Sequence, residues 1–188
     1  MQIEDITFTL KDGRSALIRS PREDDAQAVL EALRKVSGET DFLTRYPEEW
    51  EGFTVEREKA LFEQINRSDN ETMLLCLVEG RLAGNCQISW SSKRKMKHRA
   101  SVGIFLCREY WNLGIGTRLF QELIRIAEAN PELLQIELEF IEGNSRARAL
   151  YEKMGFRITA MRPNAFRLKD GSLHNEYTMI REIKDRIR

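Results

Sequence analysis

The feature that most constrains this sequence is a strand-like run, a glycine turn and an amphipathic helix in direct succession. The run spans residues 101–106, the turn contains Gly114 and Gly116, and the helix pattern covers residues 116–130. Two glycines at a helix start let the backbone approach a ligand and leave the first-turn N–H groups pointing outward. Together with the helix dipole these groups attract an anion, which predicts a phosphate pocket. A plain tight turn is the alternative interpretation.

A second motif follows further along the chain. Asn144 precedes a helix-like segment, residues 145–154, which ends on Gly155 before the chain returns to a strand pattern at Phe156. Asparagine is a favoured helix N-cap and glycine a favoured residue just after a helix. The segment therefore predicts a short capped helix between two strands.

Taken together, the two motifs over residues 101–156 resemble the GCN5-related N-acetyltransferase (GNAT) family. The motif style is similar to that of the branches that acetylate small amines or the N-termini of ribosomal proteins. The resemblance implies a single N-acetyltransferase domain over residues 1–188, which uses acetyl-coenzyme A (acetyl-CoA). It implies acetyl transfer to a primary amine of a small molecule or peptide N-terminus, by direct attack in a ternary complex. A homodimer would fit the family. A non-catalytic acetyl-CoA-binding regulatory protein is the alternative.

The resemblance also implies which residues bind the cofactor. Backbone groups at the strand end would contact the pantetheine arm, and these belong to Phe105, Leu106 and Cys107. The amides of the turn would hold the pyrophosphate; they belong to Asn112, Leu113, Gly114, Ile115, Gly116 and Thr117. Asn144 would cap its helix and reach the cofactor arm. One departure is Trp111, where the family usually has Gln or Arg; we interpret it as the mark of a branch.

Two residues are implied as catalytic. Tyr151 follows Asn144 at the spacing of the family's tyrosine general acid, which lies beside the sulfur of coenzyme A, so Tyr151 is implied as a cofactor-binding residue too. A phenol with a pKa near ~10 can protonate a departing thiolate. The alternative is a ring packed into the core. Glu139 matches a catalytic glutamate of the relatives that acetylate ribosomal N-termini, and it could relay a proton through water. Glu137 on the same strand face is its rival, and a simple exposed carboxylate is the alternative. Ser101 stands where some other relatives place a glutamate base, which argues against that variant.

The cysteines and histidines predict neither disulfides nor a metal site. The three cysteines form no Cys-x-x-Cys pair, and there are only two histidines. Cys107 lies near the expected thioester, so an acyl-cysteine is conceivable, although the family works by direct attack. Cys76 and Cys86 fall in apolar runs and are expected in the core.

The charge balance argues against a nucleic-acid or membrane partner. Lys plus Arg and Asp plus Glu number 30 each, so the chain has no global field. A basic segment at residues 91–99 is more typical of a solvated loop than of a binding site. No apolar run is long enough for a membrane span, and the N-terminus lacks signal-peptide features. We therefore expect a soluble, cytoplasmic protein.

The remaining pattern completes an α/β fold. Three hairpins are predicted at residues 6–19, 73–90 and 156–181, two helices at residues 20–38 and 54–66, and a strand at residues 133–141; all are marked by turn residues and periodicity. The order is β-β-α-α-β-β-β-α-β-α-β-β. This predicts a mixed, mostly antiparallel central sheet with helices on both faces.

Residues 39–53 show no clean periodicity. They combine Phe42, Tyr46, Trp50 and Phe53 with five carboxylates. One interpretation is a solvated loop with aromatic anchors, and the other is an acidic, aromatic wall for a cationic amine.

Overall fold

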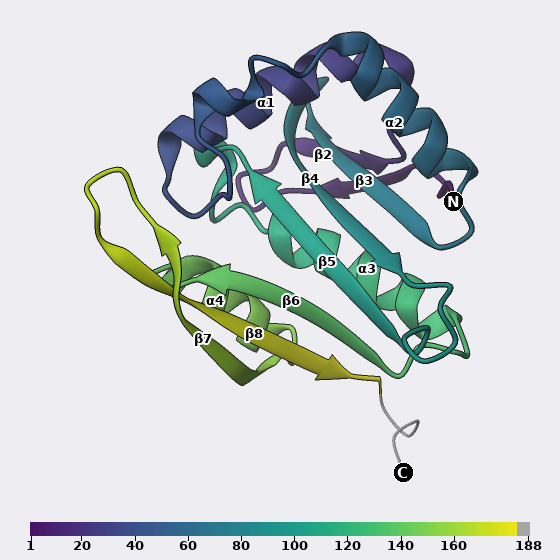
Figure 1. Cartoon of the computed structure of the whole chain (residues 1–188). Helices are drawn as coiled ribbons and strands as arrows, with labels where there is room; N and C mark the ends of the chain where they lie inside the picture. Colours follow the sequence, from purple (N-terminus) through teal and green to yellow (C-terminus); the bar gives the residue numbers. More distant parts are fainter. Residues whose placement is uncertain (184–188) are drawn as a thin grey trace. The chain divides into compact units, whose positions relative to one another are not determined.

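Eight strands and four α-helices make up residues 1–183, the part of the chain that the computed structural model describes (Figure 1). The strands are Ile6–Thr9 (β1), Ser15–Arg19 (β2), Glu71–Val78 (β3), Arg81–Trp90 (β4), Arg99–Leu106 (β5), Gln135–Ile141 (β6), Arg157–Arg167 (β7) and Leu173–Glu182 (β8). The helices are Ala26–Glu39 (α1), Val55–Arg67 (α2), Ile115–Ala129 (α3) and Ser145–Lys153 (α4). Short 3-10 turns lie at Glu23–Asp25, Pro47–Trp50 and Arg108–Tyr110. This element order is the one that the sequence predicts.

The strands form one mixed sheet in the order β1-β2-β3-β4-β5-β6-β8-β7. Strands β5 and β6 pair in parallel, whereas β1–β2, β2–β3, β3–β4, β6–β8 and β7–β8 pair antiparallel. The predicted α/β class with a mostly antiparallel sheet is therefore confirmed. The predicted hairpins are confirmed as well, since each joins two antiparallel neighbours.

The chain divides into two compact units. The first unit contains Met1–Ser89 and Gly103–Leu123, and the second contains Trp90–Val102 and the residues from Ile124 onward. Strand β5 and helix α3 contribute residues to both units. The predicted single domain extends to residue 188, so its last five residues lie outside the described part of the chain.

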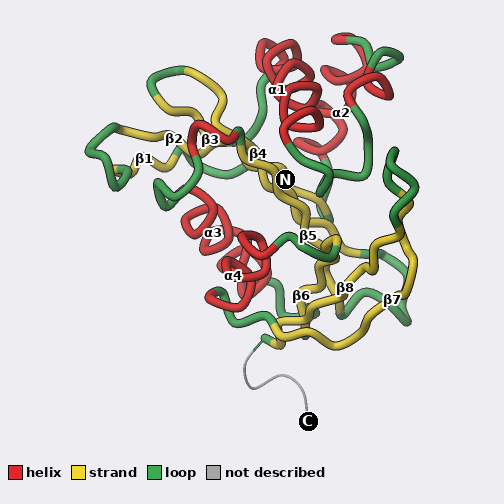
Figure 2. Tube along the Cα trace, turned by 90° about the vertical axis from the view of Figure 1, so that its left-hand side faces the viewer, coloured by secondary structure: helices red, strands yellow, loops and turns green. Residues whose placement is uncertain are grey.

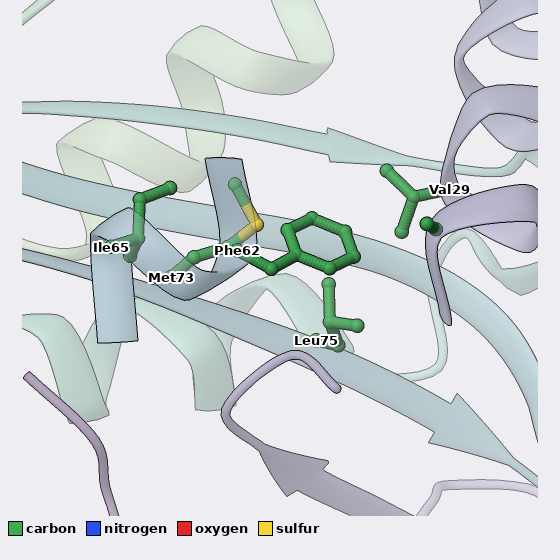
Figure 3. Packing of buried hydrophobic residues seen from close by; sticks show 6 residues of the cluster. Val29, Phe62, Ile65, Met73 and Leu75 are labelled. Atoms are coloured by element: carbon green, nitrogen blue, oxygen red, sulfur yellow. The ribbon is translucent and has the colours of Figure 1, made fainter. Parts of the chain in front are cut away.

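The first unit packs α1 and α2 against one face of β3. Alternate strand residues Met73 and Leu75 meet Val29 of α1 and Phe62 and Ile65 of α2 (Figure 3). These residues are at most 4% exposed, and their spacing fits a two-residue period on the strand and a helical period on the helices. Figures 1 and 2 show α1 and α2 side by side on this face, and the start of α3 on the other face.

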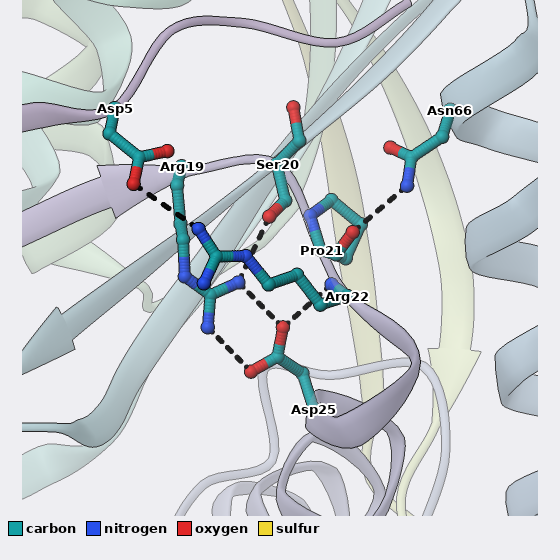
Figure 4. Close-up of polar contacts among 7 residues, drawn as sticks. All are labelled: Asp5, Arg19, Ser20, Pro21, Arg22, Asp25 and Asn66. Carbon is teal, nitrogen blue, oxygen red and sulfur yellow. Dashed lines mark hydrogen bonds and ion pairs between the residues drawn. The ribbon is translucent and has the colours of Figure 1, made fainter.

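The start of α1 differs from the sequence expectation. The sequence predicts the helix from Ser20, with this serine as its cap, but Ser20 accepts a hydrogen bond from the backbone N–H of Ile3 at 2.9 Å and the helix begins at Ala26. The Asp25 carboxylate accepts the backbone N–H of Arg22 at 2.7 Å and two N–H groups of Arg19 at 2.6 and 2.8 Å (Figure 4). The buried ion pair thus fixes the chain as it passes from β2 into α1.

The end of α1 also lies beyond the expected stop at Ser37-Gly38, because the helix continues to Glu39. The Ser37 hydroxyl accepts a hydrogen bond from the Trp50 indole at 2.9 Å. This buried bond gives the Ser37 side chain a partner while Ser37 stays in the helix.

Helix α2 begins within the segment predicted as a helix over residues 54–66, and Thr54 caps it. The Thr54 hydroxyl accepts the backbone N–H of Arg57 at 3.2 Å. The side chains that face the core are Glu58, Phe62 and Ile65. Leu61 belongs to the apolar periodicity that predicted this helix, but it is 37% exposed.

The second unit is organised by the β6–β8–β7 ribbon. Ile136, Leu138 and Phe140 of β6 are buried on one face, as predicted from their alternation. Asn144 caps α4, and Gly155 follows that helix with φ at +85°, a left-handed conformation that favours glycine. Within residues 1–183, none of the helices combines the length and the apolar character that a membrane span needs.

Candidate active site

The glycine turn at the start of α3 belongs to the first unit. Asn112 and Gly114 both have left-handed backbones, with φ at +64° and +95°. The first helical bond of α3 runs from the Arg118 N–H to the Gly114 carbonyl at 3.1 Å. The N–H groups of Ile115 and Gly116 come before this bond, so helix geometry directs them out of the N-terminal end. The turn therefore has the form of an anion cradle.

Trp111 joins this turn to the strand that precedes it. Its indole N–H donates to the carbonyl of Leu106 at 2.9 Å, and the Arg108 guanidinium lies 5.4 Å from its ring centre. The residue interpreted as a branch marker therefore has a structural role in holding the turn against the end of β5.

The end of β5 is closely packed against β4. The Cys107 N–H donates to the Ala83 carbonyl at 2.9 Å. A side chain at Gly84 would collide with backbone atoms of Phe105 and Leu106, so this approach requires glycine. A cofactor arm would share the Leu106 carbonyl with the Trp111 indole, and the contacts of Phe105, Leu106 and Cys107 with such an arm stay a prediction.

Cys107 is 3% exposed, and burial raises the pKa of its thiol. A raised pKa keeps the group protonated at neutral pH, which argues against an acyl-cysteine intermediate. Cys76 and Cys86 are buried in strands β3 and β4 as expected, and burial raises the pKa of Cys76 to about 12.

In the second unit, β6 carries the two candidate bases. Glu139 is exposed, on the face opposite Ile136 and Leu138. Glu137 accepts a hydrogen bond from the Gln135 amide at 2.7 Å and lies 3.5 Å from the Arg99 guanidinium. Because Glu137 is already held by a cation, Glu139 is the more accessible carboxylate of the two.

Asn144 and Tyr151 lie at the two ends of α4. The Asn144 side chain accepts the backbone N–H of Ala147 at 3.2 Å, which confirms the cap. The Tyr151 residue is 7% exposed, and its ring lies 6.0 Å from Phe140 and 6.3 Å from Phe156. The ring thus packs in an aromatic cluster, as the alternative interpretation expected. The proton-donor role of its hydroxyl stays a prediction.

The structure brings the predicted residues together in two groups, one in each unit. The first unit contains the cofactor-binding candidates of β5 and of the glycine turn, Phe105 to Cys107 and Asn112 to Thr117. The second unit contains Glu139, Asn144 and Tyr151.

The irregular segment, residues 39–53, uses its aromatic rings within the first unit. Trp50 is 8% exposed, and the Arg45 guanidinium lies 5.0 Å from the Trp50 ring centre and 5.3 Å from that of Phe53. The Arg57 guanidinium also lies 5.0 Å from the Phe53 ring. These rings already contact cations of the chain, which favours the interpretation as anchors.

One buried acid was missed by the sequence reasoning. Glu58 is 6% exposed on the core face of α2. The available indication was its position one helical turn before Phe62, on the same stripe. As for metals, the described residues contain no cluster of three potential His, Cys, Asp or Glu ligands.

The comparisons identify the class of protein. Residues 39–156 match the sequence profile of the acetyltransferase (GNAT) family, so the chain belongs to this family. No curated protein sequence matches it. The acetyltransferase of the GNAT family from Streptococcus pneumoniae is 29% identical, with 89% of this chain and 99% of that chain covered and a TM-score of 0.83.

Two less similar structures share the fold and contain coenzyme A or its acetyl form. One is RimL, a ribosomal L7/L12 alpha-N-protein acetyltransferase in complex with coenzyme A. It is 16% identical, with 92% of this chain and 96% of that chain covered and a TM-score of 0.74. The other is yncA from Salmonella typhimurium with its cofactor acetyl-CoA, at 17% identity, coverage of 91% and 95%, and a TM-score of 0.77.

Proposed function

We propose that this protein is an acetyl-CoA-dependent N-acetyltransferase that modifies a primary amine of a small molecule or a peptide N-terminus. The observation that carries this proposal is the glycine turn between β5 and α3, in a chain of the acetyltransferase family. The proposal covers one domain, residues 1–188, in the cytoplasm, and a homodimer as its assembly.

The turn fits the diphosphate of the cofactor. The backbone N–H groups of Ile115 and Gly116 lie at the N-terminal end of α3, before its first helical hydrogen bond. Backbone donors at a helix start bind phosphate without a lysine. We assign the whole turn, Asn112 to Thr117, to this role, and the end of β5 and Asn144 to the cofactor arm. When bound, acetyl-CoA supplies the acetyl group as a thioester.

The residues of the second unit would move the protons. Tyr151 would donate its hydroxyl proton to the leaving thiolate, as a general acid. Glu139 would accept a proton from the attacking ammonium through water. The exposure of Glu139 and the ion pair of its neighbour Glu137 with Arg99 support this choice.

The first experiment measures thiol release from acetyl-CoA with a panel of polyamines, amino acids, aminoglycosides and short peptides. Release with one class of amine supports the enzyme and defines its acceptor. Binding of acetyl-CoA without release on any amine would instead favour the regulatory protein.

Three variants and one control variant test the residue roles, by thiol release and by cofactor binding. Tyr151→Phe should lower kcat about 100-fold or more with little change in cofactor affinity, since a general acid contributes about that much. Glu139→Gln should lower kcat, whereas Glu137→Gln, the matched control, should change it little.

Gly116→Trp should abolish cofactor binding, because the indole would fill the space over the turn; unchanged affinity would contradict the phosphate assignment.

A further inference from the structure

The first turn of α2 carries a carboxylate that the acetyl transfer proposed above does not use. Glu58 is 6% exposed, although its helix lies at the surface of the first unit. Val55 and Phe62, one turn to each side, both pack in the apolar cluster under α1 and α2. Because residues three and four apart share a helix face, Glu58 faces the same side as this cluster.

The Glu58 carboxylate lacks a partner within residues 1–183. Nothing in this part of the chain donates a hydrogen bond to it or forms an ion pair with it. The charge that acts on it is that of Arg57, whose guanidinium lies over the Phe53 ring. Burial raises the pKa of Glu58. A buried carboxylate without a donor is costly, so it requires an explanation.

The carboxylate oxygens nevertheless touch open space. Within residues 1–183, the fully enclosed side-chain polar atoms without a partner are Asn66 Oδ1, Arg118 Nε and Arg181 Nε. The Glu58 oxygens have no partner and do not belong to this group, so they retain some solvent contact. This solvent contact is the point at which a small polar group of a ligand would approach them.

The C-terminal half of α1 connects this region to the segment that follows β5. The Lys35 ammonium lies 3.0 Å from the Glu109 carboxylate, and the Arg108 N–H donates to the Glu39 carboxylate at 3.1 Å. Leu33, on the same half of α1, packs against the cluster that contains Val55.

Strand β4 makes a second connection. Leu82 packs against the same cluster, and its carbonyl lies 3.9 Å from the Cys107 sulfur at the end of β5. Glu58 therefore lies on the side of the first unit where β5 ends. This is the end at which the family resemblance implies the cofactor arm.

We infer that Glu58 binds a second cationic group of the acceptor, so that the acceptor is a diamine or polyamine rather than a monoamine. This inference rests on the proposed acetyl transfer. A carboxylate stabilises the ammonium form of an amine and raises its pKa, whereas the attacking amine must be neutral. The cation that Glu58 binds is therefore one that does not react.

A matched pair of acceptors tests the inference, 1,4-diaminobutane and n-butylamine, which differ in the second ammonium group. We expect a lower KM for the diamine with the unaltered protein. Glu58→Gln should raise the KM of the diamine about 10-fold or more, toward that of butylamine, since a charged hydrogen bond is lost. The KM of butylamine and that of acetyl-CoA should stay unchanged. Glu56→Gln, an exposed carboxylate on the same helix, is the matched control.

Equal changes for both acceptors, or no change for either, would overturn the inference and leave the acetyl transfer intact. If neither amine supports thiol release, calorimetric titration with 1,4-diaminobutane separates the two proposals. Binding to the unaltered protein and to Glu56→Gln, with at least a 10-fold loss in Glu58→Gln, supports Glu58 as the cation site. Equal binding to all three, or binding to none, overturns it. Thermal melting followed by circular dichroism verifies that each variant is folded.

Discussion

The starts of α1 and α2 each carry a carboxylate with little solvent exposure, and the two differ in their hydrogen-bond partners. At the start of α1, Asp25 receives hydrogen bonds from the side chain of Arg19 and the backbone of Arg22. At the start of α2, Glu58 is more buried and receives none from the described residues. The first acid has its partners within the fold, whereas the second has none there, and we propose that a ligand supplies its partner.

The two acids also differ in the direction of their pKa shifts. Burial acts to raise the pKa of Asp25, but the hydrogen bonds from Arg19 and Arg22 outweigh it and hold that pKa below its usual value. For Glu58 burial prevails and the pKa is raised. The contrast can be tested by substituting one residue at a time.

The largest effect is expected from Arg19→Met. The substitution would leave the Asp25 carboxylate buried without its cation, and side chains of this pair are only 8% and 13% exposed. We expect a loss of about 3 kcal/mol in the free energy of unfolding, measured by urea denaturation. The double variant Arg19→Met/Asp25→Leu should recover part of this loss. No recovery would mean that packing of the Arg19 stem dominates.

A smaller loss is expected from Thr54→Ala, which removes the cap of α2. The Thr54 hydroxyl accepts the Arg57 N–H, and such a cap contributes about 1 kcal/mol. The same urea titration measures the change. Thr54→Ser, which retains the hydroxyl, should behave like the unaltered protein.

A gain in stability is expected from Glu58→Gln. The neutral amide avoids the cost of a buried charge, so the free energy of unfolding should rise by roughly 0.5 kcal/mol. The same variant should lose its preference for the diamine. A loss of stability would show that the carboxylate does stabilise the fold, which would remove the contrast with Asp25.

The smallest effects should appear in the pH dependence. The contribution of Asp25 is complete above its unfolded pKa of about 3.9 and is lost as the pH falls through the lower pKa of the folded state. The contribution of Glu58 to stability comes from its protonated form. It is complete below its unfolded pKa of about 4.3 and is lost as the pH rises through the raised pKa of the folded state. Urea titrations of the unaltered protein, Asp25→Asn and Glu58→Gln across this range should therefore give difference curves of opposite slope.

Local patterns in the sequence predicted the order of all helices and strands correctly. The hairpins at Asp12-Gly13 and Glu79-Gly80 and the cap at Asn144 depend on residues that are neighbours in the chain. Such local chemistry can be recognised without knowledge of the rest of the fold.

The misses involve contacts with distant residues. Ser20 is bound to Ile3 rather than capping α1, and Ser37 remains helical with a partner at Trp50. Leu61 is exposed and Glu58 is buried, because the packing of α2 against the sheet selects which stripe of the helix faces the core. Helical periodicity alone does not fix that rotation.

In the candidate site, too, the local features were predicted and a contact between separate segments was not. The glycine turn and the Asn144 cap followed from spacing, and both have the expected local geometry. The bond from Trp111 to Leu106 required knowledge of where the strand ends relative to the turn.

That bond also makes Trp111 an optical reporter of the turn. Indole emission responds to the electric field across the ring, and this indole is held in place by its hydrogen bond to the Leu106 carbonyl and lies beside the Arg108 guanidinium. A dianionic group that arrives at the start of α3 would change that field. With Trp50 and Trp90 replaced by phenylalanine, the colour of the remaining fluorescence would report occupancy of the turn directly, in the absence of any acceptor.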